Sequence, residues 1–380
     1  MAKIYTYSDF EGFSNSTKDT LISLTEIIGS AWMVCFQICP ALACISYVVI
    51  LFHLVILCRK SMRIHSVNLI MLGISICDFA KLSYDTYAVF SILTATKCTP
   101  PLSYPFKLMD FWSPAVADVA RRLGTWLTFL MAVLRFFILR SSLNPRFNKV
   151  SKPKYSLKMM FLAFVISSLM SLFYWGRFEI VEDKIWIPPI DCEGFASNFS
   201  IQGYKSILRS EYLNRQGPIV RIFNLADGLL KLIPSIMFPI LTVLLIRELR
   251  RADDSLRKNS VSKKEESKSD HTTKLVIMMS ITFIAAEGPY GIVYFFQGVV
   301  TEPRGLVDMS SDLLRIFEVF MIINATSHCL VCFAVSSQYR RTVKDLFCCV
   351  KEPTIMRSSA SRISGLGGDN VIKVVSKMGK

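Results

Sequence analysis

The sequence predicts an all-α fold: a seven-transmembrane helix bundle with its N-terminus outside, its C-terminus inside and an amphipathic eighth helix. Three observations predict it. There are seven long apolar blocks, the net charge of the connecting segments alternates in sign, and the cysteines avoid the outside segments except for one pair. Of the 380 residues, 52% are hydrophobic, and the mean hydropathy is +0.41. Such a surplus of apolar residues is typical of a membrane protein.

Each apolar block is long enough for one crossing, because ~30 Å of hydrocarbon takes about 20 helical residues. Helices are expected because every backbone polar group must be bonded without water. The expected spans cover residues of about 31–58, 67–93, 113–139, 155–175, 219–246, 274–300 and 309–335. The expected regions are an outside N-terminus over 1–28, the bundle over 29–336, the amphipathic helix over 337–349 and a disordered cytoplasmic tail over 350–380.

The charges of the connecting segments test this number of spans. The four segments on one side of the membrane carry a net charge of −3, and the four on the other side carry +18, which together give the chain its +15. Lys and Arg favour the cytoplasmic side. The alternation therefore fits seven crossings and places the N-terminus outside. A nucleic-acid-binding protein, the other class that a basic chain suggests, would not need its basic residues in alternate segments.

Cysteine usage agrees with this topology. Of the 11 cysteines, only Cys98 and Cys192 fall in outside segments, which face the oxidising compartment. We expect a disulfide between them, with two free thiols as the alternative. Glycosylation sequons begin at Asn15 and Asn198 in the outside segments. A third match, at Asn324, lies inside the seventh span and should be inert.

The segment after the seventh span has the spacing of an amphipathic helix at the cytoplasmic interface. Tyr339 falls on its apolar face and Arg340 on its basic face. Two adjacent cysteines at its end, Cys348 and Cys349, are expected palmitoylation sites.

Ionisable residues and prolines interrupt the spans. Arg135 lies in the apolar run TWLTFLMAVLR, where a charge is costly and marks function. The alternative is that a lone arginine reaches the nearby cytoplasmic interface. Asp78 lies in the middle of the second span. Pro239 and Pro289 break the backbone ladder of the fifth and sixth spans and supply pivots.

This arrangement resembles the rhodopsin-like G protein-coupled receptors. Within them, the chain is similar to the nematode serpentine receptors of class W, which are grouped with FMRFamide-type neuropeptide receptors. The similarity runs from about residue 31 to 347 and is carried by FHLVILCRKSMR, TWLTFLMAVLR, FPILTVLLIRELR, AAEGPYGI and NATSHCLVCFAVSSQYRRTVK. It implies a multi-pass receptor of the plasma membrane that binds an extracellular ligand and couples to a heterotrimeric G protein.

The resemblance also implies roles for individual residues. Arg135 would face the cytoplasmic cavity where the G protein docks, although Leu134 replaces the usual acid before it. Asp78 would line a central polar cavity and hold a sodium ion, with Asn324 as its partner. The residues expected to act in coupling and activation are Arg135, Asp78, Asn324, Pro239, Pro289, Tyr339 and Arg340.

Two motifs depart from the rhodopsin-like pattern. The Asn-Pro-x-x-Tyr motif of the seventh span is replaced by a stretch from His328 to Cys332. The aromatic-rich motif of the sixth span is replaced by Ala286-Glu287-Gly288-Pro289. Both changes touch the parts of such receptors that switch on activation.

The outer halves of the spans carry charges of both signs, which suits a peptide with a charged or amidated end. Ala117 occupies the position where amine receptors carry an aspartate, which counts against a monoamine ligand. The expected pocket residues are Asp118, Arg121, Arg122, Glu287, Asp312 and Arg315, and the first three are expected to share one helix face. The alternative is that Asp118–Arg122 and Asp312–Arg315 are ion pairs that only fix helix packing. The second outside loop, 176–218, is expected to act as a lid that contacts the peptide.

We therefore expect a peptide receptor, with a chemoreceptor for a small environmental molecule as the alternative. A transporter or channel is a distant alternative, because the halves of the sequence show no internal repeat. The four histidines are scattered, and the sequence has no nucleophile–base pattern, so neither an enzyme nor a metal site is expected. Beyond the sodium ion, no cofactor and no nucleic-acid partner are expected.

Overall fold

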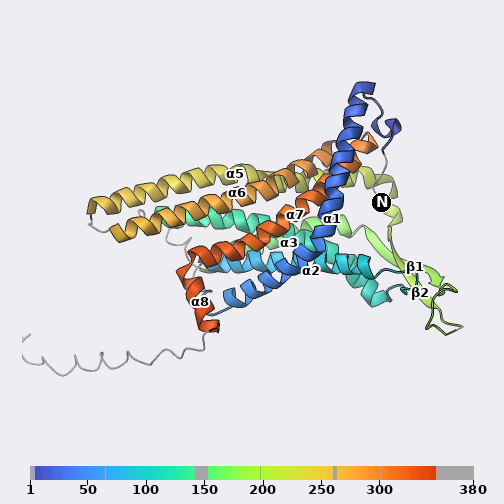
Figure 1. Cartoon of the computed structure of the whole chain (residues 1–380), viewed down its shortest axis with the longest axis horizontal. Helices are drawn as coiled ribbons and strands as arrows, with labels where there is room; N and C mark the ends of the chain where they lie inside the picture. Colours follow the sequence, from blue (N-terminus) through green and yellow to red (C-terminus); the bar gives the residue numbers. More distant parts are fainter. Residues whose placement is uncertain are drawn as a thin grey trace, which may run out of the picture.

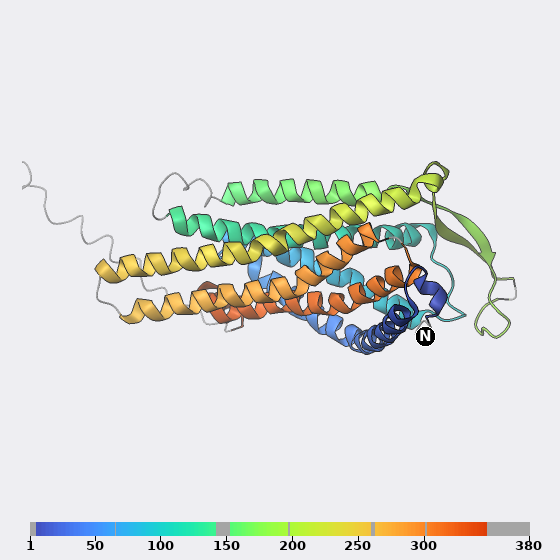
Figure 2. The ribbon, with the colours of Figure 1, turned by 90° about the horizontal axis from the view of Figure 1, so that it is seen from above.

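The structure, a computed structural model, describes residues 5–64, 66–141, 153–196, 198–259, 263–300 and 302–347. Long helices run side by side, with a short helix across one end and a β-hairpin at the other (Figures 1 and 2). This confirms the predicted helix bundle. The long helices are α1 (Asn15–Leu57), α2 (Ser66–Thr94), α3 (Tyr104–Ser141), α4 (Pro153–Trp175), α5 (Gln216–Asn259), α6 (Lys263–Val299) and α7 (Arg304–Val335).

Some helices are longer than the apolar blocks that predicted them. α1 begins at Asn15, about four turns before the predicted start at residue 31. The Ser14 hydroxyl accepts a hydrogen bond from the Thr17 N–H at 3.4 Å and so caps this polar extension. α5 continues beyond the predicted end of its span at residue 246 to Asn259, and α6 begins at Lys263, before the predicted start of its span at residue 274 (Figure 1).

The helices are built for a lipid surrounding. Within the described residues, five of them, α1, α2, α4, α5 and α7, are long and apolar enough to cross a membrane by length and composition. The buried side chains of α4 are Ser156, Ser167 and Ser171, whereas Phe161 is 66% exposed and Leu169 60% exposed. A helix that turns its serines inward and its large apolar residues outward fits a membrane and not water.

The bundle closes as a ring in the order α1, α2, α4, α5, α6, α7, with α3 inside it against α2, α4 and α5. α5 and α6 approach closely through glycines. A Cβ atom on Gly228 would lie 2.5 Å from the backbone N of Phe295, and one on Gly298 would lie 2.7 Å from the backbone N of Leu225. Larger residues would force these two helices apart.

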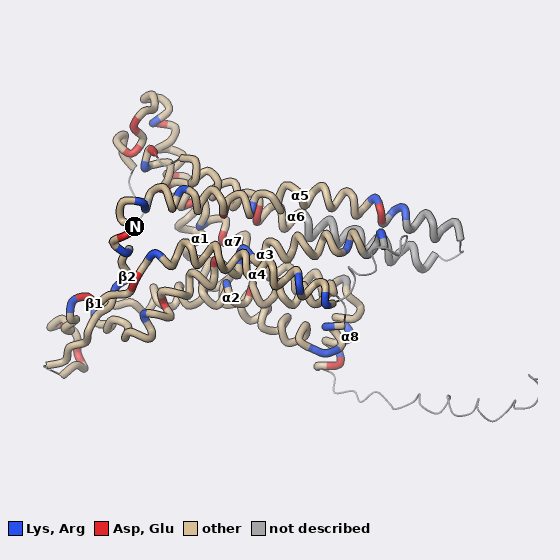
Figure 3. The backbone as a smooth tube through the Cα atoms, turned by 180° about the vertical axis from the view of Figure 1, so that it is seen from behind, with Lys and Arg blue, Asp and Glu red and all other residues tan. Residues whose placement is uncertain are grey.

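The hairpin end of the bundle faces outside. Strands β1 (Phe178–Trp186) and β2 (Ile201–Leu208) are antiparallel and follow α4. Cys192, between the strands, forms a disulfide with Cys98 before α3, the pair that the sequence predicts. Disulfides form in an oxidising compartment. The N-terminus lies at the same end as the hairpin (Figure 1). Lys and Arg gather at the other end of the bundle, on α5 and on the eighth helix (Figure 3).

The eighth helix, α8 (Ser337–Phe347), lies across the inner end of the bundle (Figure 1). Tyr339 is buried, and its hydroxyl lies 2.8 Å from Nδ1 of His53 on α1. Val343 and Leu346 pack on the inner core beside it, so the predicted apolar face is confirmed. The predicted palmitoylation sites Cys348 and Cys349 and the predicted disordered tail lie outside the described residues.

Candidate functional site

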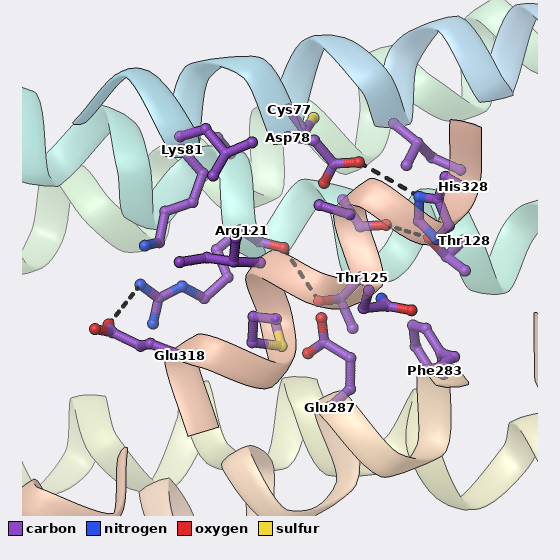
Figure 4. Close-up of a pocket in the computed structure, with 18 of the residues that line it drawn as sticks. Cys77, Asp78, Lys81, Arg121, Thr125, Thr128, Phe283, Glu287, Glu318 and His328 are labelled. Atoms are coloured by element: carbon purple, nitrogen blue, oxygen red, sulfur yellow. Dashed lines mark hydrogen bonds and ion pairs between the residues drawn. The ribbon is translucent and has the colours of Figure 1, made fainter. Parts of the chain in front are cut away.

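A polar cavity lies between α2, α3, α6 and α7 (Figure 4). It has an empty volume of about 610 Å³, counting the part open to solvent. The ionisable and amide residues that line it are Asp78, Lys81, Asp85, Arg121, Glu287, Glu318, Asn324 and His328.

Helical spacing brings these side chains together. On α2, Asp78, Lys81 and Asp85 follow at intervals of three and four residues and therefore lie on one face. On α3, Arg121 and Thr125 are four residues apart and turn toward that face. The cavity thus forms where the polar faces of these otherwise apolar helices lie against one another.

Two ion pairs occupy the outer half of the cavity. Lys81 pairs with Asp85 one turn along α2. Nη2 of Arg121 lies 3.3 Å from Oε1 of Glu318 on α7 (Figure 4). The Arg121 guanidinium also lies 4.8 Å from the centroid of the Tyr290 ring on α6, within the range of a cation–π contact. Arg121 therefore joins α3 to α6 and α7.

The inner half of the cavity holds Asp78 and His328. Nδ1 of His328 lies 3.4 Å from Oδ2 of Asp78, a contact that is an ion pair when the imidazole is protonated. The sequence predicts Asn324 as the partner of Asp78. The structure instead places His328, about one turn further along α7, against that carboxylate. Asn324 lines the same cavity, and its Oδ1 has no hydrogen-bond partner among the described residues.

Glu287 differs from the other carboxylates of the cavity. It is 4% exposed and makes no ion pair with any residue that the structure describes. Its carboxylate lies beside Thr125 (Figure 4), and its Oε2 has no hydrogen-bond partner in the described protein. A buried polar atom without a partner costs about 1–3 kcal/mol. The cavity atoms in this state are Asp78 Oδ2, Arg121 Nε, Glu287 Oε2 and Asn324 Oδ1.

Arg122, the neighbour of Arg121, belongs to a different set of contacts. Its Nε donates to Asp227 Oδ1 on α5 at 2.7 Å, and its Nη1 donates to the Ser167 carbonyl on α4 at 2.8 Å. Lys231 pairs with the other oxygen of Asp227. All three charged side chains are buried. We call Arg122, Asp227 and Lys231 the α3–α5 charge cluster.

Of Asp118, Arg121 and Arg122, which the sequence predicts on one helix face and in the pocket, the structure places only Arg121 in the cavity wall. Adjacent residues point about 100° apart on a helix, so Arg121 and Arg122 serve different neighbours. Asp118 does not line the cavity. Its carboxylate accepts a hydrogen bond from Trp175 Nε1 at 3.0 Å, which ties α3 to α4.

Asp312 and Arg315, also predicted pocket residues, lie on the outer part of α7 and do not line the cavity. They form an ion pair with a separation of 4.0 Å, which matches the structural alternative for this pair. The Tyr5 hydroxyl donates to Asp312 at 3.4 Å. Burial and the Asp312 carboxylate raise the pKa of Tyr5 to about 12. The N-terminal segment is thereby held against α7.

The outer surface carries the two sequons. Asn15 at the start of α1 and Asn198 in the hairpin connection are both exposed, so neither is hindered by burial. Phe10 is completely buried against Gly305 of α7, where a Cβ atom would lie 2.5 Å from its ring. The N-terminal segment thus packs on the outer end of the bundle (Figure 2).

At the inner end, Arg135 makes no hydrogen bond or ion pair with a described residue. Leu134, in place of the usual acid, is 3% exposed and packs in the inner core. Nη1 of Arg340 donates to the Ala334 carbonyl at 2.6 Å and caps the end of α7. Pro239 and Pro289 lie inside α5 and α6.

Sequence reasoning missed several cavity residues. Lys81, Asp85, Glu318 and His328 line it but were not among the predicted site residues. The spacing of Asp78, Lys81 and Asp85 was the signal that could have found the α2 stripe. No comparable signal pairs His328 with Asp78, because they lie on different helices.

Comparison with known families agrees with this geometry. The family model of the serpentine type 7TM GPCR chemoreceptor Srw matches residues 37–350. A search of curated proteins found no match. The match covers most of the chain and includes every helix that forms the cavity. Its members are receptors and not a class of enzymes. The chain therefore belongs to the Srw family of serpentine G protein-coupled chemoreceptors and is a multi-pass protein of the plasma membrane.

Proposed function

We propose that the extracellular ligand of this receptor is a peptide, of the FMRFamide-like kind, and that the bound receptor activates a heterotrimeric G protein inside the cell. The observation that carries the proposal is the β1–β2 hairpin at the outer end of the bundle (Figure 1). A small molecule that sinks into a helix bundle needs no such surface, whereas a peptide has a backbone and several side chains to bind.

The hairpin has the features of a peptide-binding edge. Within the described chain its strands pair only with each other, so each strand keeps one free edge for an added strand. Ile185 and Ile187 are 60% and 67% exposed and offer apolar contacts. Across the strands, Lys205 Nζ lies 2.9 Å from Asp183 Oδ1, which adds charges of both signs. The Cys98–Cys192 disulfide holds this surface to the bundle.

A second candidate, a small-molecule chemoreceptor, is favoured by the size of the cavity. The cavity is confined between the side chains of α2, α3, α6 and α7, so it admits one chemical group and not a whole peptide. In the peptide proposal, one end or one side chain enters the cavity while the remainder lies on the hairpin.

Activation is a shift between two arrangements of the helices, and the agonist must bind the active arrangement more tightly. Pro239 and Pro289 lack the N–H that continues a helix ladder, so α5 and α6 can pivot there. Arg135 has no ion-pair partner among the described residues, which leaves it available to the G protein. Tyr339 and Arg340 hold α8 against α1 and α7 at the same end of the bundle.

A sodium ion at the inner end of the cavity is part of this proposal. Asp78 Oδ2 and Asn324 Oδ1 are oxygen atoms without a hydrogen-bond partner in the described chain, and oxygen is the donor that a hard cation prefers. The ion would compete with protonated His328 for the Asp78 carboxylate.

The test is a calcium or cAMP response in cells that express the full chain with a promiscuous G protein, screened against amidated neuropeptides. The Arg135→Ala variant runs alongside. We expect at least one peptide to act on the unmodified receptor and the response to be lost in Arg135→Ala at equal surface expression.

Silence across the peptide panel at good surface expression would favour the small-molecule chemoreceptor. A response that survives Arg135→Ala would keep the peptide proposal and remove the role of Arg135. Leu139→Ala, at the inner end of the same helix, serves as the control for a general effect of substitution there.

A further inference from the structure

We propose that Glu287 is the counter-charge for a cationic group of the ligand, a guanidinium or an ammonium. The inference rests on the proposed function in one respect, that the cavity receives part of the ligand. It adds the chemical class of the group that enters and the residue that selects it.

The charge of the cavity is the first argument. Its lining contains four carboxylates, on Asp78, Asp85, Glu287 and Glu318, against two permanent cations, on Lys81 and Arg121. With His328 neutral, the lining is left with two formal negative charges. Charges in a site of low dielectric interact strongly, so such a lining attracts a cation and rejects an anion.

The pairing of these charges identifies the residue. Lys81 pairs with Asp85, Arg121 with Glu318, and His328 faces Asp78. Glu287 is the lining carboxylate that remains without such a partner in the described structure. It is 4% exposed, and its Oε2 lacks a hydrogen-bond partner there.

Two buried cations on the neighbouring helices α3 and α5 pair with another acid and not with Glu287. Lys231, on the neighbouring α5, is held by Asp227 and lies 3.7 Å from the centroid of the Tyr294 ring. Arg122 is also taken up by Asp227. Both of these cations are therefore committed to Asp227, and an unpaired buried carboxylate is costly. A cationic ligand group would remove that cost.

The shape of the site fits one cationic head group. Thr125 and Phe283 lie close to Glu287 in the cavity wall (Figure 4). A planar guanidinium or a compact ammonium matches the space available and can donate to a carboxylate with charge-assisted hydrogen bonds. The group could come from a basic side chain of a peptide or from a small amine.

The test uses the purified full-length receptor and its melting temperature. The probes are acetylarginine amide, its uncharged counterpart acetylcitrulline amide, and phenethylammonium as a small amine. The unmodified receptor should be stabilised by the arginine probe and not by the citrulline probe. Glu287→Gln should weaken binding of the cation by about tenfold or more, because one charge-assisted contact is lost.

Two further variants keep the result interpretable. Glu26→Gln makes the same chemical change at an exposed site on α1 and should leave the arginine shift intact. Glu287→Asp keeps the charge and should retain part of the shift. If Glu287→Gln does not fold, Glu287→Asp supplies the test, because moving the carboxylate should reduce the arginine shift, and an unchanged shift would overturn the inference.

Equal shifts with both amide probes, no shift with any cation, or an unchanged arginine shift in Glu287→Gln would each overturn the inference. A shift from phenethylammonium alone that depends on Glu287 supports it, with a small amine as the source. A peptide agonist whose potency Glu287→Gln leaves unchanged overturns this inference but not the peptide proposal. A cation effect that depends on Glu287, combined with a silent peptide screen, supports this inference and overturns the peptide proposal.

Discussion

Arg121 and Arg122 are adjacent in the sequence, yet they belong to two regions that treat charge differently. In the α3–α5 charge cluster, Arg122 has a carboxylate, a backbone carbonyl and the Ser171 hydroxyl as partners. In the cavity, Arg121 has one carboxylate at 3.3 Å, and its Nε has no hydrogen-bond partner in the described chain. The charged side chains of the α3–α5 charge cluster therefore have their hydrogen-bond partners within the protein, which we call saturated, whereas those of the cavity do not.

The difference separates a structural role from a ligand-binding one. Saturated buried charges hold three helices together and leave nothing for a ligand to bind. Polar atoms without partners around a cavity gain from a ligand that supplies them. Burial alone does not separate the two regions, because Glu287 is as deeply buried as Asp227.

The largest effect is expected from Asp227→Ala, which leaves two buried cations without their acid. Breaking a buried ion pair costs roughly 3–5 kcal/mol, so we expect a sharply lower melting temperature and poor surface expression. Asp110→Ala serves as the control, because that acid pairs with Lys107 at the partly exposed outer end of α3, and such pairs contribute about 0–1 kcal/mol.

A rescue experiment sharpens this test. The combination of Arg122→Leu, Asp227→Leu and Lys231→Met removes all three charges together and should restore much of the stability lost in the single variant. If Asp227→Ala melts like the unmodified receptor, the α3–α5 charge cluster does not have the structural role assigned to it.

Smaller effects are expected from substituting the two arginines, and the two variants should differ in whether stability or agonist potency changes. Arg121→Gln should change stability less than Arg122→Gln, because Arg121 has one carboxylate partner at 3.3 Å, whereas Arg122 has three hydrogen-bond partners. It should reduce agonist potency by about tenfold, which is the effect of losing one contact between the ligand and the charged Arg121 side chain. Arg122→Gln should mainly lower the melting temperature. The comparison of the two regions fails if both variants give the same pattern in melting temperature and dose–response assays.

Much of the fold could be predicted from the sequence because the membrane imposes strong rules. Block length and the alternation of loop charge give the number of spans and their direction. Compartment chemistry gives the pair Cys98 and Cys192. A period of 3.6 residues gives α8. The early start of α1 at Asn15 was missed because its polar first turns carry no apolar signal.

The site was harder to predict, because side-chain partners depend on the rotation of each helix. Asp227 lies 105 positions from Arg122, and nothing local in the sequence shows that they meet. The rotation of α3 decides that Arg121, and not Arg122, enters the cavity. Glu287 was predicted to line the pocket, because an acid beside Pro289 in an apolar span is conspicuous in the sequence. The structure places it in the cavity lining.

The smallest effect on stability is expected from breaking an Asp–Lys pair that is exposed to water. Asp183 and Lys205 on the hairpin form the same kind of pair as Asp227 and Lys231, but they are 40% and 53% exposed. The hydrogen bond from Lys205 lowers the pKa of Asp183. A lowered pKa in the folded state means that the contribution to stability is present above the usual aspartate pKa and is lost as the pH falls through the lowered value.

Asp183→Asn should therefore leave the melting temperature at neutral pH nearly unchanged, since solvent screens exposed pairs. Any difference from the unmodified receptor should vanish in acid, where Asp183 is protonated, and should shrink in high salt. Melting curves of both proteins at neutral and acidic pH measure this. A large loss at neutral pH would mean that the hairpin pair has a structural role like that of the α3–α5 charge cluster. The contrast between saturated buried charges and solvated ones would then need another cause than burial.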